Sequence, residues 1–189
     1  MVSYGKLLCQ EFMASNDVEN LLSYFNYDLL DRPTIFNGAQ GSYMLKGLGQ
    51  FAEMITEEEQ AAMEASIQRL NGLEDLDDDF IKITMLLSPE EANRVSQAFN
   101  RDFDGNLVAV PSGFGAIDFI QKGMHKAWGL KQLLNHWDLS ENNVMAFGDG
   151  DNDLELLQMA GRSYAMEMPV QLFYKWLIRL LPIIKTKEY

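Results

Sequence analysis

The 189-residue chain is 47% hydrophobic and 11% aromatic, and it carries a formal net charge of −13. This composition fits a globular protein with a core, and the negative charge argues against nucleic acid or an anionic membrane as the main partner. The single cysteine, Cys9, excludes an internal disulfide and fits a reducing compartment. No signal peptide pattern and no apolar run of roughly 18 residues is present, so we expect a cytoplasmic protein.

The first two thirds of the chain alternate predicted helices and strands with short connections, as in a small α/β domain. The predicted helices cover residues 18–25, 56–70 and 88–99. The predicted strands cover residues 34–36, 80–87, 107–110 and 116–120. Capping boxes at Thr56 and Ser88 open the second and third helices, and Ser15 or Asn16 is expected to cap the first. In the second helix Ala62, Ile67 and Leu70 are expected to point inward.

The remaining part predicts one unit of a parallel sheet. A helix over 125–134 precedes an apolar strand over 143–147, the loop FGDGDNDL, a helix over 154–160 that stops at Gly161, and a strand over 164–166. The acidic loop therefore follows the carboxyl end of a strand that looks buried. In open parallel sheets this end is where ligands bind.

The acidic loop allows three interpretations. Carboxylates at a strand end suit Mg²⁺, which takes one or two carboxylates together with waters and phosphate. The spacing of Asp149, Asp151 and Asp153 imitates the start of a calcium loop, but Leu154 and Ala160 stand where that loop needs glycine and glutamate. A polar turn in which Asp153 caps the next helix is the alternative without a ligand.

Four landmarks in the same order resemble the haloacid dehalogenase (HAD) superfamily, and most closely its Cof-type sugar phosphatases of subfamily IIB. The loop from Gly148 to Asp153, followed by Leu157, Ala160-Gly161 and Ala165-Met166, resembles the fourth motif of that family. The other landmarks are Ser112–Asp118, similar to the last cap strand; Gly123–Lys126, similar to the third motif; and Trp137–Asn143, similar to a linker. The resemblance is strong over 112–167 and weaker but continuous over 1–111.

The resemblance implies an α/β fold: the C-terminal half of a HAD Rossmann-like parallel-sheet core over 122–189, and an α/β cap domain of type IIB over 1–121. It also implies a Mg²⁺-dependent phosphatase, a hydrolase that acts on small phosphorylated metabolites such as sugar phosphates. Nucleic acid and membrane are not expected partners.

The resemblance also implies roles for individual residues. Asp149 matches the ligand of Mg²⁺, while Asn152 and Lys126 match the side chains that bind the substrate phosphate. Asp153 matches a carboxylate that holds these groups in position without contacting the substrate. The mixture suits the chemistry, because a cation and a lysine offset the negative charge of a transferring phosphoryl group. His125 and His136 lack metal-like spacing, and we interpret both as structural or surface residues.

The nucleophile of the family is not found. Relatives carry it in a DxDGT motif after the first core strand, whereas here the predicted cap begins almost at Met1, so about the first third of a full-length relative is expected to be absent. Residues 102–106 read DFDGN, but a helix-like stretch precedes them, so a helix-to-strand turn is expected there. No catalytic residue is therefore predicted, and the strand over 143–147 is expected to have an unpaired edge.

The tail departs from the family. Residues 168–189 hold four basic and one acidic side chain, and we hypothesise a frameshift after Glu167. The rival interpretation is a basic amphipathic helix for membrane or partner binding. The function then has three interpretations: a phosphatase by lineage; a remnant that is inactive unless a separate N-terminal half-core polypeptide completes it; and a non-catalytic module that binds phosphate or a metabolite.

Overall fold

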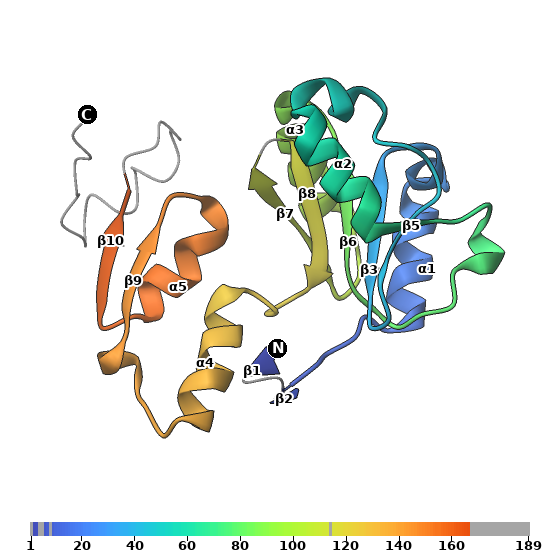
Figure 1. Ribbon diagram of the computed structural model, residues 1–189. Coiled ribbons are helices and arrows are strands. Elements are labelled where there is room, and N and C mark those ends of the chain that lie inside the picture. Colours follow the sequence, from blue (N-terminus) through green and yellow to red (C-terminus); the bar gives the residue numbers. More distant parts are fainter. Residues whose placement is uncertain (1, 4–5, 8, 114, 167–189) are drawn as a thin grey trace. The chain divides into compact units, whose positions relative to one another are not determined.

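The computed structural model describes residues 2–3, 6–7, 9–113 and 115–166, and it is a mixed α/β structure (Figure 1). The fold class is therefore confirmed. The chain divides into two compact units, of which the first is Gln10–Lys122 and the second holds the residues on either side of it. The predicted boundary fell after residue 121, but the residues before Gln10 group with the second unit. The names cap and core half remain predictions.

The first unit is built on a six-stranded sheet with the order β5-β4-β3-β6-β8-β7. Neighbouring strands run antiparallel except for β4 and β5, which are parallel. The strands are β3 (Thr34–Gly38), β4 (Ser42–Met44), β5 (Ile67–Arg69), β6 (Phe80–Leu86), β7 (Leu107–Gly113) and β8 (Ala116–Gln121). All four predicted strands of this region are confirmed.

Two helices cover one face of this sheet, namely α1 (Ser15–Tyr24) and α3 (Pro89–Asp102). The main core lies between them and the strands, and Phe36, Phe99 and Phe119 in it are fully buried. The rings of Phe99 and Phe119 meet edge to face with centroids 5.0 Å apart. The strand alternation explains this core, because every second residue points to the helices.

The opposite face is covered only in part. A second cluster, Ile35, Met44, Leu48 and Leu86, packs there against Met63 of helix α2 (Glu57–Ser66) and against the 3-10 helix η2 (Gly49–Met54) through Ala52. The rest of this face carries polar side chains, among them Lys82 and Asp118, and the partly buried Val108 and Ile120.

Two helix ends differ from prediction. The N-cap of α1 is Ala14, which makes no side-chain hydrogen bond. Met13, the residue before it, donates its N–H to Phe80 O, and this bond fixes the backbone so that Ala14 rather than Ser15 or Asn16 precedes the first turn. Helix α2 ends at Ser66 rather than at Leu70, because residues 67–69 pair with β4 as strand β5. The open edge of β4 thus overrides the helical pattern. Ala62 is exposed, and Met63 instead points inward.

The N-terminus of α3 follows the prediction. Ser88 Oγ accepts the N–H of Glu91 at 3.3 Å and also contacts Glu91 Oε2 at 3.0 Å, with Pro89 at the first helical position. The helix runs three residues beyond the predicted end, to Asp102.

The second unit contains α4 (Lys126–His136), β9 (Met145–Gly148), α5 (Leu154–Met159) and β10 (Arg162–Ala165). Strands β9 and β10 are parallel, as predicted, with Ala146 opposite Ser163 and Gly148 opposite Ala165. A short antiparallel pair, β1 (Val2–Ser3) and β2 (Lys6–Leu7), belongs to the same unit. Four more 3-10 turns are described. Two lie in the first unit, η1 (Asp28–Asp31) and η3 (Leu73–Asp75), and two in the second, η4 (Glu141–Asn143) and η5 (Asp151–Asp153).

Strand β9 is buried on one face alone. Ala146 packs with Leu157 and Ala165, whereas Met145 and Phe147 are 50% and 53% exposed. The Phe147 ring stacks on that of Tyr164 in β10, with centroids 5.2 Å apart. Among the described residues, the expectation of a buried strand therefore holds for one face of β9 and is wrong for the other. The predicted start at Asn143 is also wrong, because Ser140 and Asn143 form a capping box that holds residues 141–143 in a 3-10 turn.

Within the described part of the chain, no helix has the length and apolar character needed to cross a bilayer. The interpretations of the tail after Glu167 lie outside the described residues.

Candidate active site

The acidic loop folds around the carboxylate of Asp153. This side chain is 7% exposed, and its Oδ2 accepts the backbone N–H groups of Asp149 at 3.1 Å and Gly150 at 3.3 Å. The carboxylate thus points back toward the end of β9. Asp153 occupies the N-cap position of α5 but makes no capping hydrogen bond, so the simple polar turn with an Asp153 cap is wrong.

Lys126 completes this arrangement from another element. It is the first residue of α4, and its Nζ donates a hydrogen bond to Asp153 Oδ1 across 27 positions of sequence. Half of the lysine side chain is exposed. Burial alone would raise the pKa of Asp153, but the Lys126 hydrogen bond and the two backbone N–H groups outweigh it and lower that pKa. Asp153 is therefore a carboxylate at neutral pH.

Gly148 makes the close approach of Asp153 possible. A Cβ atom at Gly148 would lie 2.6 Å from the Cβ and 3.0 Å from the Cγ of Asp153. Any larger residue would push the carboxylate away from the loop amides. The glycine before Asp149 therefore has a packing reason that belongs to this site.

Asp149 and Asn152 lie at the mouth of the same loop. Asp149 directly follows β9 and is exposed, and Asn152 is half-buried in the turn before α5. The structure therefore brings Lys126, Asp149, Asn152 and Asp153 to one end of β9. The roles predicted for these four residues stay predictions, although their common location is what those roles require.

The donor set fits Mg²⁺ as part of a shared site. Within the described ranges, no three His, Cys, Asp or Glu side chains gather closely enough to hold a metal ion by themselves. Asp153 already accepts from Lys126 and two amides, whereas Asp149 is exposed and can offer its carboxylate to an ion. Mg²⁺ commonly takes one or two carboxylates together with waters and a substrate phosphate, so Asp149 suits one ligand position.

The DFDGN stretch is not part of this loop. Asp102 ends α3 and Leu107 begins β7, so residues 103–106 form the expected helix-to-strand turn. Asp102 is exposed and pairs with Arg101, whose Nε lies 2.7 Å from Oδ1, and this hydrogen bond lowers the pKa of Asp102. The turn belongs to the unit Gln10–Lys122.

The histidine at the start of α4 is structural, as expected. His125 Nδ1 accepts the N–H of Trp128 at 3.2 Å and so caps the helix that carries Lys126. His136 is exposed at the other end of α4.

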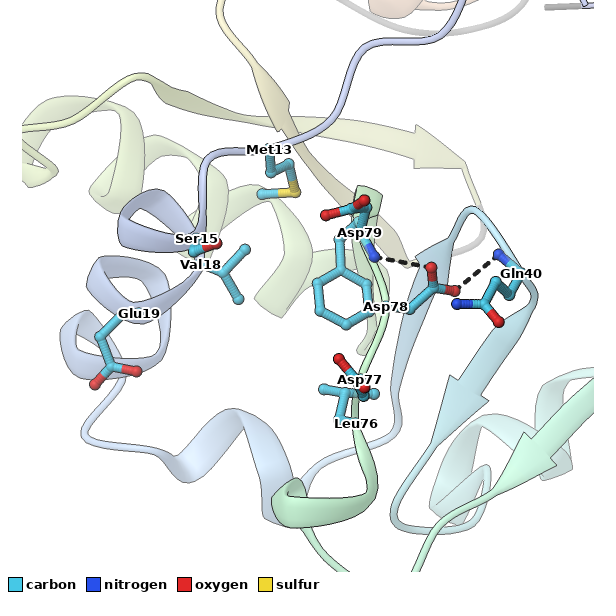
Figure 2. A pocket seen from close by; sticks show the side chains of 10 residues that line it. Met13, Ser15, Val18, Glu19, Gln40, Leu76, Asp77, Asp78 and Asp79 are labelled. Atoms are coloured by element: carbon cyan, nitrogen blue, oxygen red, sulfur yellow. Dashed lines mark hydrogen bonds between the residues drawn. The ribbon is translucent and has the colours of Figure 1, made fainter.

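The first unit contains a hollow of about 420 Å³ at the start of β6, with acidic walls (Figure 2). Glu19, Asp77, Asp78 and Asp79 line it beside Met13 and Phe80. Asp78 accepts the N–H of Gln40 at 2.8 Å and the hydroxyl of Tyr43 at 2.9 Å, so its carboxylate is already used in holding the hollow together. Such walls repel a phosphate, and we assign the hollow no part in phosphoester binding.

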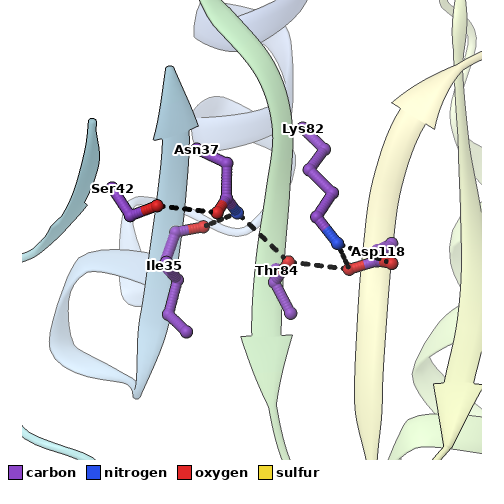
Figure 3. A network of polar contacts seen from close by, with 6 residues as sticks. All are labelled: Ile35, Asn37, Ser42, Lys82, Thr84 and Asp118. Carbon is purple, nitrogen blue, oxygen red and sulfur yellow. Dashed lines mark hydrogen bonds and ion pairs between the residues drawn. The ribbon is translucent and has the colours of Figure 1, made fainter. Parts of the chain in front are cut away.

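A polar network on the sheet of the first unit was not predicted. It joins Asn37, Ser42, Lys82, Thr84 and Asp118 (Figure 3). A signal was present in the sequence, because Lys82 and Thr84 occupy alternate positions of an otherwise apolar strand. Their partner Asp118 is distant in sequence, so the network itself needed the strand order.

Comparison with known proteins identifies the class. Residues 2–169 match the family of haloacid dehalogenase-like hydrolases, and the chain therefore belongs to this family. The protein SMU.1108c from Streptococcus mutans UA159 has a similar structure, with a TM-score of 0.73 and 29% identity over 92% of this chain and 64% of that one. The resemblance predicted from the motifs is confirmed.

Two further proteins, one similar in sequence and one in structure, resemble this chain. The chain is 36% identical over 142 residues to 5-amino-6-(5-phospho-D-ribitylamino)uracil phosphatase YbjI of Escherichia coli (strain K12), which covers 74% of this chain and 51% of the relative. It shares its fold with the HAD subclass IIB sugar phosphatase BT4131, at a TM-score of 0.65 and 17% identity, over 89% of this chain and 61% of that one. The chain thus spans about half the length of its curated relative.

Proposed function

We propose that this chain supplies the phosphate-binding and Mg²⁺-binding groups of a phosphatase for a small phosphorylated metabolite. The observation that carries the proposal is the Lys126–Asp153 pair at the end of β9, beside Asp149 and Asn152. An ammonium group on a half-exposed side chain, a half-buried side-chain amide and an exposed carboxylate at one end of a strand are what a phosphoester with a bound cation requires.

Each side chain then has a defined task. Lys126 binds a phosphate oxygen, and Asp153 holds the lysine and the loop in place without touching substrate. Asn152 donates a hydrogen bond to the phosphate, and Asp149 binds the ion. When bound, Mg²⁺ offsets the negative charge of the phosphoryl group.

The proposed substrate class follows from the relative. YbjI is named as a phosphatase of a compound that contains a phosphorylated ribityl chain. We propose a phosphorylated polyol or sugar derivative of this kind for the present chain. The proposed setting is the cytoplasm, and neither nucleic acid nor membrane is a proposed partner.

The nucleophile is proposed to lie outside these 189 residues, in a segment that carries the DxDGT motif. The sequence contains no DxDGT motif, and its nearest approach, DFDGN, lies in a turn of the other unit. The proposal is therefore that turnover needs an added half-core polypeptide with that motif. A second candidate, supported by the same missing motif, is a module that binds the phosphorylated metabolite and does not hydrolyse it.

A turnover assay separates these candidates. Hydrolysis of p-nitrophenyl phosphate and of the ribityl substrate is measured with Mg²⁺, for the purified chain alone and with a polypeptide that carries a DxDGT strand. We expect turnover in the mixture, and its loss in Asp149→Ala but not in the control Asp102→Ala. Turnover by the chain alone that Asp102→Ala abolishes would place the nucleophile in the DFDGN turn and refute the proposal. Metabolite binding without turnover in any mixture would favour the second candidate.

A further inference from the structure

The chain contains the dipeptide Asn-Gly at two places, Asn37-Gly38 and Asn71-Gly72, and both lie in the first unit. An asparagine before a glycine can lose its side-chain amide without an enzyme, because the next backbone nitrogen can attack the side-chain carbonyl carbon. Glycine favours this attack, since it has no Cβ to hinder the approach and it restricts the backbone least. The fold places the two dipeptides in opposite surroundings.

The first dipeptide is held in strand β3. Asn37 Nδ2 lies 3.4 Å from Thr84 Oγ1, and Asn37 Oδ1 accepts the hydroxyl of Ser42 at 3.0 Å (Figure 3). The nitrogen of Gly38, which would have to attack, donates its N–H to Gly41 O at 2.8 Å. Both reacting groups are therefore engaged, and pairing with β4 and β6 keeps the backbone extended.

The second dipeptide lies in the bend between β5 and η3. Asn71 is exposed, and its side-chain amide makes no hydrogen bond to a residue that the structure describes. The nitrogen of Gly72 likewise donates to none of the described residues. Strand β5, which ends two residues before Asn71, is the edge strand of the sheet. Such a bend opens at almost no cost, so its two reacting groups can meet.

We propose that Asn71 is a site of spontaneous deamidation in the folded protein. The Gly72 nitrogen forms a bond to Cγ of Asn71, the bond from Cγ to Nδ2 breaks, and Nδ2 leaves as ammonia with the proton of the Gly72 N–H. The cyclic imide then takes up water and opens at either carbonyl, which gives aspartate or isoaspartate. Water is the co-reactant, and the proposal does not rest on the proposed function.

The product would disturb the edge of the sheet. A new carboxylate at position 71 precedes the acidic run Glu74–Asp79 and repels Asp75, whose Oδ2 accepts the N–H of residue 71 at 3.3 Å. In the isoaspartate form the Cβ atom also becomes part of the main chain. The neighbouring N–H of Leu70 donates to Met44 O at 3.1 Å, and we expect this bond between β5 and β4 to loosen.

The experiment follows both dipeptides in one sample. The purified full chain is incubated at neutral pH with and without urea, and peptide mapping by tandem mass spectrometry measures the mass gained when an amide becomes an acid. In the folded chain we expect Asn71 to react about tenfold or more faster than Asn37, because an exposed bend opens far more often than a paired strand. In urea the two rates should converge, since the fold that separates them is lost.

Variants then test the chemistry of the bend. Gly72→Ala should slow the reaction of Asn71 several-fold, because a Cβ hinders the attack. The φ of Gly72 is −157°, which any residue adopts, and the new methyl group would meet the carboxylate end of the Glu74 side chain, which can move. The control Gly47→Ala, whose methyl group would lie 3.6 Å from the nearest atom, should leave the rate at Asn71 unchanged.

A third variant tests the consequence. Asn71→Asp reproduces the aspartate product and should speed the exchange of the Leu70 amide with solvent deuterium several-fold. An unchanged exchange rate would refute the loosening of β5.

The proposal is overturned if Asn37 and Asn71 react equally fast in the folded chain, or if Asn71 reacts in urea alone. A folded Gly72→Ala chain that reacts as fast as the natural chain would overturn it as well. If that variant fails to fold, the comparison of the two dipeptides in the natural chain decides. The phosphatase assay uses freshly purified protein, so its result stands apart from all of these.

Discussion

The sheets of the two units are covered by other elements to very different extents. In the first, six strands meet two helices over a continuous core that contains three fully buried phenylalanines. In the second, the described parallel sheet has two strands, its buried cluster is Ala146, Leu157 and Ala165, and Phe147 on the other face stays half exposed. The first unit buries a large apolar cluster between its sheet and two helices, whereas the second carries the acidic loop on a two-stranded sheet whose other face stays exposed among the described residues.

The largest difference between the two units is expected from a matched pair of side-chain truncations. Phe99→Ala removes a ring that contacts Tyr24, Phe103 and Phe119, and should cost about 3–5 kcal/mol of unfolding free energy in the first unit. Phe147→Ala loses one ring contact at a half-exposed site and should cost about 1 kcal/mol or less. Urea unfolding followed through amide signals of each unit measures both.

An equal cost for the two substitutions would contradict the contrast, because it would mean that Phe147 is buried in solution. A change confined to the second unit after Phe99→Ala would contradict it as well.

A smaller effect is expected from Gly148→Ala. The new methyl group would meet the Asp153 side chain at 2.6 Å, so the carboxylate must move and the Lys126 hydrogen bond should be lost, at about 1–3 kcal/mol. The control Gly47→Ala places its methyl group 3.6 Å from the nearest atom and should be almost neutral. Thermal unfolding together with the amide shifts of residues 149 and 150 reports the outcome, and unchanged shifts in Gly148→Ala would show that the close approach is not needed.

The open face of β9 should also promote self-association. Among the described residues β9 pairs with β10 alone, and an apolar strand with an open face and edge is a template for pairing with another chain. Phe147→Lys should therefore reduce association in concentrated solution, whereas Leu139→Lys, an exposed apolar residue outside any strand, should not. Light scattering against concentration measures this, and equal association of all three chains would argue that β9 is already covered.

The smallest expected effect is the pH dependence of the stability that Asp78 contributes. Burial would raise the pKa of Asp78, but hydrogen bonds from Gln40 N–H, the Tyr43 hydroxyl and two further amides lower it. The folded pKa lies below the unfolded value of about 3.9, so this stabilisation is present above that pH and is lost as the pH falls through the folded pKa. The Tm difference between the natural chain and Asp78→Asn should shrink from pH 6 to pH 3. A difference that does not change with pH would refute this account of Asp78.

Local signals in the sequence explain what could be predicted. The Ser88 capping box with Pro89 specifies the start of α3 through neighbouring residues, and the alternation in β6 and β8 indicates strands without any knowledge of their partners. The third and fourth motifs likewise predicted that Lys126, Asp149, Asn152 and Asp153 share one site, since the resemblance depends on residue order, and the structure places all four at one end of β9.

Features that depend on distant partners could not be predicted. Residues 67–69 continue a helical pattern and become a strand only because the edge of β4 is open beside them. The Asp153 carboxylate looked like a helix cap, but Lys126 and the loop amides draw it back toward β9. The Lys82–Asp118 pair needed β6 and β8 to be neighbours.

The most direct test of the central claim is the affinity of the chain for inorganic phosphate with Mg²⁺, measured by calorimetry for Lys126→Ala and Lys131→Ala. Both lysines lie on α4, but only Lys126 contacts Asp153 at the loop. We expect Lys126→Ala to weaken phosphate binding about tenfold or more and Lys131→Ala to leave it unchanged. Equal affinities for phosphate in the two variants would contradict the assignment of this loop as the phosphate site.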